Sequence, residues 1–157
     1  MVNRWFFMFI WFLVFAMLNG VFSNSLFLVS DFAVCNGQYV AYTNEAYNLS
    51  LNDVVVAKNG CGEVYKTSIN NYGAVLRGLD KIAVEKVVLQ GETFAEIKEK
   101  LGLKILEKIV VNDSITLYNC YTNKYKKSVD TECGKMNIQV AICANCVCVG
   151  YPFLIDY

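Results

Sequence analysis

The stretch KMNIQVAICANCVCVG, from Lys135 to Gly150, predicts two antiparallel strands joined by a tight turn. Apolar side chains occupy every second position from Met136 to Ile142, a pattern typical of a strand whose two faces meet different surroundings. The alternation resumes after Ala144 and Asn145, so these two residues are expected to form the connection. A two-residue turn fixes the register of a hairpin.

This register sorts the side chains of the hairpin onto two faces. It places Ile142 opposite Val147, Ala141 opposite Cys148, Val140 opposite Val149, and Cys143 opposite Cys146. One face is continuously apolar and is the predicted core side: Met136, Ile138, Val140, Ile142, Val147 and Val149. The other face gathers three thiols with smaller or polar side chains: Cys143, Cys146, Cys148, Asn137, Gln139 and Ala141. Cys120, which points away from Ile115 and Leu117, would approach the thiols if its strand is a neighbour.

Two short helices are predicted upstream of the hairpin. Thr93 and Glu96 form a capping box, a core stripe of Phe94, Ile97 and Leu101 follows, and Gly102 is placed to end that helix. A second helix is expected to begin at Asn71, with Val75, Leu79 and Ile82 on one face.

The remaining strands are predicted from alternation and turn residues: Gln38–Thr43, Val54–Ala57, Glu63–Thr67, Glu85–Gln90, Lys104–Val111 and Ser114–Tyr121. Asn36-Gly37 is a hairpin-type turn signal after the apolar stretch 25–34, and we expect the first portion to form a small meander. The predicted fold class is therefore α+β: one domain over residues 24–157, with an antiparallel sheet packed by one or two short helices.

The N-terminal segment has the layout of an export signal. Arg4 is followed by fourteen uncharged apolar residues, from Trp5 to Leu18, and then by small residues that favour cleavage after Ser23. The alternative is an uncleaved membrane anchor, for which the apolar run is short. Either outcome predicts a chain that is secreted, or anchored and facing the extracytoplasmic side. The membrane is then a partner only through an uncleaved segment.

Composition excludes several function classes. The chain has 14 basic and 14 acidic residues, which gives no electrostatic reason to expect nucleic acid as a partner. It has no histidine, the commonest general base and the usual nitrogen ligand of zinc. We predict no catalytic residue and no cofactor, and hence a protein that is not an enzyme. Asn48 and Asn112 fit the glycosylation acceptor pattern.

The chain has seven cysteines: Cys35, Cys61, Cys120, Cys133, Cys143, Cys146 and Cys148. Their presence allows four interpretations. Export favours disulfides, with an odd cysteine left over, and Cys35 with Cys61 is a possible pair. Free cysteines also serve as small buried hydrophobic residues. A metal site could use the three thiols of the hairpin, with Cys120 or Cys133 as a fourth ligand. Redox chemistry is the fourth interpretation, although the C-x-x-C pair brackets a turn and does not begin a helix.

The C-terminal half carries phrases that resemble a known family: Gly91–Phe94, Leu101–Leu106, Ile115–Tyr118, Tyr121-Thr122, Gly134–Ile142 and Val149–Ile155. Over about residues 72–157 the chain resembles the YwmB-type family, small exported proteins of Gram-positive bacteria and their wall-less relatives. The resemblance implies a fold like that of the TATA-box-binding protein, a curved antiparallel sheet backed by helices. It supplies no catalytic residue, and the three hairpin cysteines depart from the polar turn expected there. A shared fold does not imply DNA binding.

These observations lead to two functional hypotheses. The first is an exported, non-enzymatic domain that binds a protein or a component of the cell envelope. The second is an extracytoplasmic thiol protein that uses Cys143, Cys146 and Cys148 for redox or metal chemistry.

Overall fold

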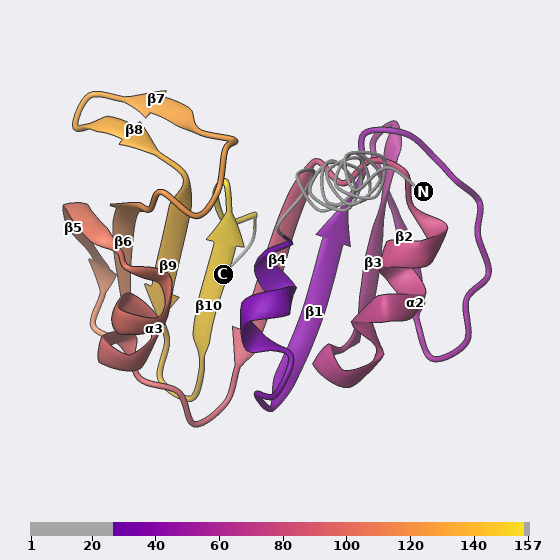
Figure 1. Ribbon diagram of the computed structural model, residues 1–157, viewed down its shortest axis with the longest axis horizontal. Coiled ribbons are helices and arrows are strands. Elements are labelled where there is room, and N and C mark those ends of the chain that lie inside the picture. The colour runs from indigo at the N-terminus through magenta and orange to yellow at the C-terminus, as the bar shows by residue number, and fades with distance from the viewer. Residues whose placement is uncertain (1–26, 156–157) are drawn as a thin grey trace, which may run out of the picture.

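The computed structural model describes residues 27–155, and its main element is an eight-stranded sheet in which every neighbouring pair is antiparallel (Figure 1). The elements in chain order are η1 (Leu28–Phe32), β1 (Gly37–Tyr42), β2 (Val55–Asn59), β3 (Gly62–Ser68), η2 (Ile69–Asn71), α2 (Tyr72–Gly78), β4 (Val84–Leu89), α3 (Phe94–Leu101), β5 (Lys104–Asn112), β6 (Ile115–Tyr121), β7 (Val129–Thr131), β8 (Gly134–Met136), β9 (Ile138–Ile142) and β10 (Val147–Tyr151). The strand order is β2-β3-β1-β4-β10-β9-β6-β5, and β7 and β8 pair separately. The predicted α+β class is confirmed.

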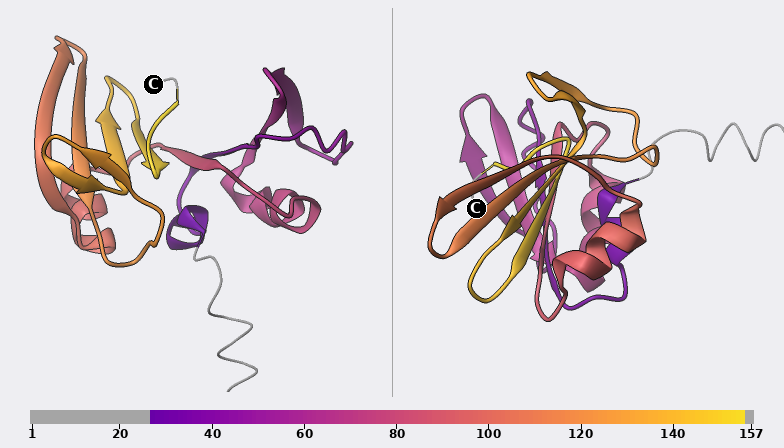
Figure 2. Two further views of the ribbon diagram at one scale, coloured as in Figure 1. Left: turned by 90° about the horizontal axis from the view of Figure 1, so that it is seen from above. Right: turned by 90° about the vertical axis from the view of Figure 1, so that its left-hand side faces the viewer.

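The helices cover one face of the sheet only. Figure 2 shows η1, α2 and α3 on the same side, with both edges of the sheet bent away from them, so the opposite face is concave. The main core lies between sheet and helices and includes Tyr39, Tyr65, Val140 and Val149, each fully buried. Directly paired residues point to the same face of an antiparallel sheet, so this core fixes which side chains reach the concave face.

Helix α3 has the ends that its sequence predicts. The Thr93 hydroxyl accepts from the Glu96 amide, the Glu96 carboxylate accepts from the Thr93 amide at 2.8 Å, and Gly102 closes the helix in the left-handed conformation. Phe94 stacks on Tyr118 of β6 with ring centroids 4.1 Å apart, which docks α3 on the sheet. The predicted second helix is present as α2, which begins one residue after Asn71 and buries Val75, but it ends at Gly78, so Leu79 and Ile82 lie beyond it and do not extend its buried face.

The first portion of the chain is not a simple meander. Residues 28–32 form a 3₁₀ helix, so Asn36-Gly37 leads from a helix into β1 and does not join two strands. Strand β1 pairs with β3 and β4, and the segment 43–54 carries the chain to β2 at the sheet edge. The Glu63 carboxylate holds that segment, because it accepts from the amides of Tyr47 at 2.8 Å and Asn48 at 3.1 Å. It also accepts from the Tyr65 hydroxyl, which lowers the pKa of Glu63.

Asn137 is a second correction, because its side chain does not join the thiol face of the hairpin. It is fully buried and interrupts the predicted long strand between β8 and β9. Its Oδ1 accepts from the Thr122 amide at 2.8 Å, and its Nδ2 donates to the carbonyls of Thr122 at 2.7 Å and Tyr125 at 3.0 Å. Buried backbone groups need partners, and one amide side chain here serves three of them.

We expect Asn137→Ala to lower the free energy of unfolding by about 2 kcal/mol, because it leaves buried backbone groups of the 122–125 loop without partners. Denaturant unfolding measures the change. The matched control is Asn123→Ala, an exposed asparagine of the same loop, with an expected change below about 0.5 kcal/mol. Equal stabilities for the two variants would contradict this role of Asn137.

The predicted signal segment, residues 1–23, lies outside the described residues. Within residues 27–155, no helix is long and apolar enough to cross a membrane.

Candidate functional site

The concave face of the sheet carries two apolar clusters that are separate from the main core. One consists of Val40, Tyr42, Val64 and Val84, from strands β1, β3 and β4. The other consists of Leu117, Ala141 and Cys148, from β6, β9 and β10, together with Leu154. An apolar patch on the outer side of a sheet is a common sign of a binding surface.

The chain's own C-terminal segment, residues 152–155, lies on this concave face (Figure 2). Leu154 is buried in the second cluster, and Phe153 and Ile155 pack against the first. The segment returns directly over Gly150 of β10, where a Cβ atom would collide with the Phe153 carbonyl group. Glycine at this position therefore permits a close approach that no other residue allows.

Side chains of the sheet recognise the backbone of the C-terminal segment. The Ile155 carbonyl accepts from the Tyr42 hydroxyl at 3.1 Å and from Lys86 Nζ at 3.3 Å. The Leu154 amide donates to Gln139 Oε1 at 2.9 Å. These contacts engage the main chain of the segment, whereas the apolar clusters receive its side chains, and proteins that bind peptides commonly combine these two kinds of contact.

A chain of polar side chains orients Gln139 toward the segment. Glu107 of β5 accepts from Asn119 Nδ2 at 2.8 Å, and Asn119 Oδ1 accepts from Gln139 Nε2 at 2.8 Å. Because the Gln139 amide donates to Asn119, its oxygen is left facing the Leu154 amide. The relay spans three neighbouring strands, and no local sequence pattern indicates it because it depends on the pairing of β5, β6 and β9.

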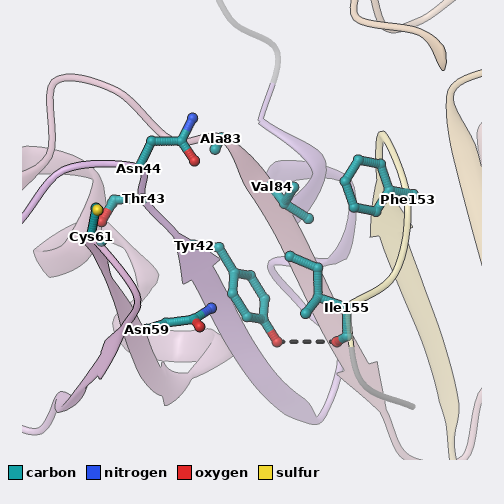
Figure 3. Close-up of a pocket in the computed structure, with 10 residues that line it drawn as sticks. Tyr42, Thr43, Asn44, Asn59, Cys61, Ala83, Val84, Phe153 and Ile155 are labelled. Carbon is teal, nitrogen blue, oxygen red and sulfur yellow. Dashed lines mark hydrogen bonds between the residues drawn. The ribbon is translucent and has the colours of Figure 1, made fainter.

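A pocket of about 420 Å³ opens beside the end of this segment (Figure 3). Its apolar wall includes Tyr42, Val84, Phe153 and Ile155, and its polar rim includes Asn44, Asn59 and Cys61. The Tyr42 hydroxyl group bonds the Ile155 carbonyl at one side of the pocket (Figure 3). The concave face is thus not completely filled by the C-terminal segment.

The hairpin register predicted from the sequence is confirmed. Ile142 pairs with Val147, Ala141 with Cys148, and Val140 with Val149, and the Cys143 amide donates to the Cys146 carbonyl at 2.9 Å across the two-residue turn. The Sγ atoms of Cys143, Cys146 and Cys148 lie within 4.8 Å of one another, and we refer to these three residues as the thiol cluster. They are on the concave side, next to Leu154, and do not face the main core.

Burial determines the electrostatics of the thiol cluster. It is the largest cause of a raised pKa at Cys143 and of the pKa of about 12 at Cys148, and the charge of Cys146 acts in the same direction on both. The Lys86 ammonium acts in the opposite direction and lowers the pKa of both thiols. Redox-active thiols commonly have lowered pKa values, so Cys143 and Cys148 lack the activation that characterises them.

The structure separates the other cysteines from the thiol cluster. Cys120 pairs with Ile138, so it lies in the main core and does not approach the cluster. Its neighbour Leu117 pairs with Ala141 and reaches the concave face instead. Cys133 is exposed at the turn between β7 and β8. The sequence showed that Cys120 and Leu117 face opposite ways, but only the strand pairing shows which one faces the core.

The proposed pairing of Cys35 with Cys61 is wrong. Cys35 precedes β1 and contacts Glu92 at 3.2 Å, whereas Cys61 lies in the β2–β3 turn, which adjoins Thr43 beyond the other end of β1. A six-residue strand is roughly 20 Å long, and a disulfide requires Cα atoms within about 7 Å. All seven cysteines lie in the part of the chain that the structure describes, and all are free thiols.

Comparisons with family models, with curated proteins and with solved structures find no match to this chain. The resemblance to the YwmB-type family therefore stays a prediction.

Proposed function

We propose that this protein is an exported binding domain whose concave face holds an extended, apolar segment of a partner polypeptide of the cell envelope. The observation that carries the proposal is the C-terminal segment itself, which lies where such a partner would bind. Export rests on the signal-like residues 1–23, and the partner's chemistry rests on the contacts of residues 152–155.

The contacts define what the partner would look like. Two apolar clusters accept side chains of an extended chain, and Tyr42, Lys86 and Gln139 bond its backbone. Backbone bonds give affinity for any extended peptide, whereas the apolar clusters select bulky aliphatic or aromatic side chains. A partner would replace the C-terminal segment, so that segment competes with it and lowers its apparent affinity.

Tryptophan fluorescence can test the proposal. Both natural tryptophans lie in residues 1–23, so in a chain that begins at Asn24 the variant Phe153→Trp carries a single tryptophan, on the concave face. We expect an excess of a synthetic peptide with the sequence of residues 150–157 to displace the segment and shift this emission to the red. An unchanged spectrum with millimolar peptide would contradict the proposal.

The backbone contacts predict which variants weaken peptide binding. In a chain that ends at Tyr151, Lys86→Met is expected to weaken binding of the same peptide about 10-fold and Tyr42→Phe about 5-fold, because each removes a hydrogen bond to its backbone. Lys104→Met on the exposed edge strand β5 is the matched control and should bind like the parent. Equal affinities for Lys86→Met and Lys104→Met would show that this face does not bind the peptide. Circular dichroism confirms that each variant is folded.

A further inference from the structure

The thiol cluster has the geometry of a metal site. Zinc–thiolate bonds are about 2.3 Å long, so two sulfur ligands of one ion lie about 3.8 Å apart in a tetrahedral site and about 4.0 Å apart in a trigonal one. The three Sγ atoms are already within 4.8 Å of one another, so closing around an ion requires movements of no more than about 1 Å. We propose that Cys143, Cys146 and Cys148 bind one thiophilic divalent ion of the zinc type.

The charges around the cluster favour a divalent ion. Three thiolates with one divalent ion carry a net charge of −1, and the Lys86 ammonium acts electrostatically on both Cys143 and Cys148. A monovalent ion such as Cu(I) would leave a net charge of −2, one more negative charge than a divalent ion leaves. Because Cys148 is 4% exposed and lies under Leu154, an uncompensated charge there would be costly.

The surroundings also provide a rigid base and an entrance. Cys148 is on β10 in the middle of the sheet, and Cys143 and Cys146 close the β9–β10 turn through a backbone hydrogen bond. The latter two are only partly buried, so an ion can reach the cluster from the end of the hairpin. Three protein ligands leave a fourth position, which water occupies in many zinc sites.

Binding must displace protons, because a thiol coordinates zinc as the thiolate. Each Sγ that binds the ion exchanges its proton for the metal bond, and the buffer takes up the protons that are released. The apparent affinity should therefore rise as the pH rises from 6 to 8. No electron is transferred in this step.

Metal titration of the reduced full-length protein tests the site. Cd²⁺ is the spectroscopic probe, followed by thiolate-to-metal absorption, and Zn²⁺ affinity is measured by competition with a chromophoric chelator. We expect one ion per chain and at least about 100-fold weaker binding in Cys148→Ser. The double variant Cys61→Ser/Cys133→Ser changes two exposed cysteines elsewhere and should bind like the parent. Lys86→Met should bind about 10-fold more weakly, with an unchanged stoichiometry.

Four results would overturn the proposal. The first is that the folded, reduced chain binds neither Zn²⁺ nor Cd²⁺ stoichiometrically, and the second is that Cys148→Ser and the double variant bind with equal affinity. The third is that the protein prefers Cu(I) and binds no Zn²⁺. The fourth is that protein isolated without reductant contains a disulfide within the cluster. Because Cys148→Ser leaves Tyr42 and Gln139 in place, peptide binding and metal binding can succeed or fail independently.

Discussion

Glu85→Gln is expected to abolish a contribution that destabilises the parent protein: ionisation of Glu85 should lower the free energy of unfolding by about 3 kcal/mol as the pH rises from 4.5 to above 7. The two proteins should be equally stable below pH 4.5, and the variant should be more stable by about 3 kcal/mol above pH 7. A substitution of a buried charged residue seldom stabilises a protein, and the position of Glu85 explains why this one should.

Glu85 is a carboxyl group on the helix side of β4, 3% exposed. Burial raises its pKa to about 7, against an ordinary value of 4.5, even though it accepts hydrogen bonds from the Leu28 amide at 3.0 Å and the Tyr39 hydroxyl at 3.0 Å. These hydrogen bonds offset only part of the cost of burying its negative charge. Glutamine can accept from Leu28 and donate to Tyr39, so it keeps both contacts without the charge.

The direction of the pH effect follows from the raised pKa. The folded state binds the Glu85 proton more tightly than the unfolded state does, so this stabilisation is complete below pH 4.5 and is lost as the pH rises through 7. Glu63 acts in the opposite direction, because its pKa is lowered in the folded state. The contribution of Glu63 cancels when the free energies of unfolding of the parent and Glu85→Gln are subtracted at each pH, because both proteins contain Glu63.

Urea unfolding of the two proteins between pH 4 and 8 measures this difference. Glu99→Gln, on the exposed face of α3, is the matched control and should follow the parent at every pH. Parallel profiles for the parent and Glu85→Gln would show that Glu85 is ionised without cost in the folded protein.

The second large effect is expected from Gly150→Ala, which should expose Cys148 to solvent and raise its alkylation rate about 100-fold. The added Cβ atom would collide with the Phe153 carbonyl group, and neither can rotate away, because the backbone of β10 fixes the Cβ atom and the carbonyl group is itself backbone. The C-terminal segment would therefore leave the concave face. Its departure removes the burial of Leu154 and the hydrogen bonds that the segment makes with Lys86, Tyr42 and Gln139. These contacts together contribute about 3 kcal/mol, which corresponds to a change of about 100-fold in the accessibility of Cys148.

Mass spectrometry resolves alkylation at each cysteine, so the same sample supplies internal standards. Cys120 in the main core should stay protected, and Cys61 should react at its unchanged, exposed rate. Gly73→Ala is the matched substitution: its Cβ would meet only Arg77 Nη1 at 3.4 Å in helix α2, and it should leave Cys148 protected. Protection of Cys148 in Gly150→Ala would show that the segment does not depend on this glycine.

Local sequence patterns determined much of the fold. The capping box at Thr93, the termination at Gly102 and the two-residue turn between Cys143 and Cys146 depend on neighbouring residues only, and the structure confirms all three. Side-chain alternation then placed Cys143, Cys146 and Cys148 on one face, because the period of a strand is fixed by its backbone.

The order of the strands, and which face of each strand lies in the main core, could be assigned only from the tertiary structure. Cys120 and Leu117 alternate in the sequence whichever of them is buried, and the pairing of β6 with β9 assigns Cys120 to the core. Likewise, nothing in the sequence distinguishes Asn137 from other polar residues of a strand. Its role is seen only in the fold, where its side chain bonds buried backbone groups of the 122–125 loop. The position of the C-terminal segment also required the tertiary structure, because its partners on β9, β4 and β1 lie 15, 69 and 113 residues away in the chain. Local patterns reflect backbone geometry over a few residues, whereas contacts between distant strands exist only once the sheet has formed.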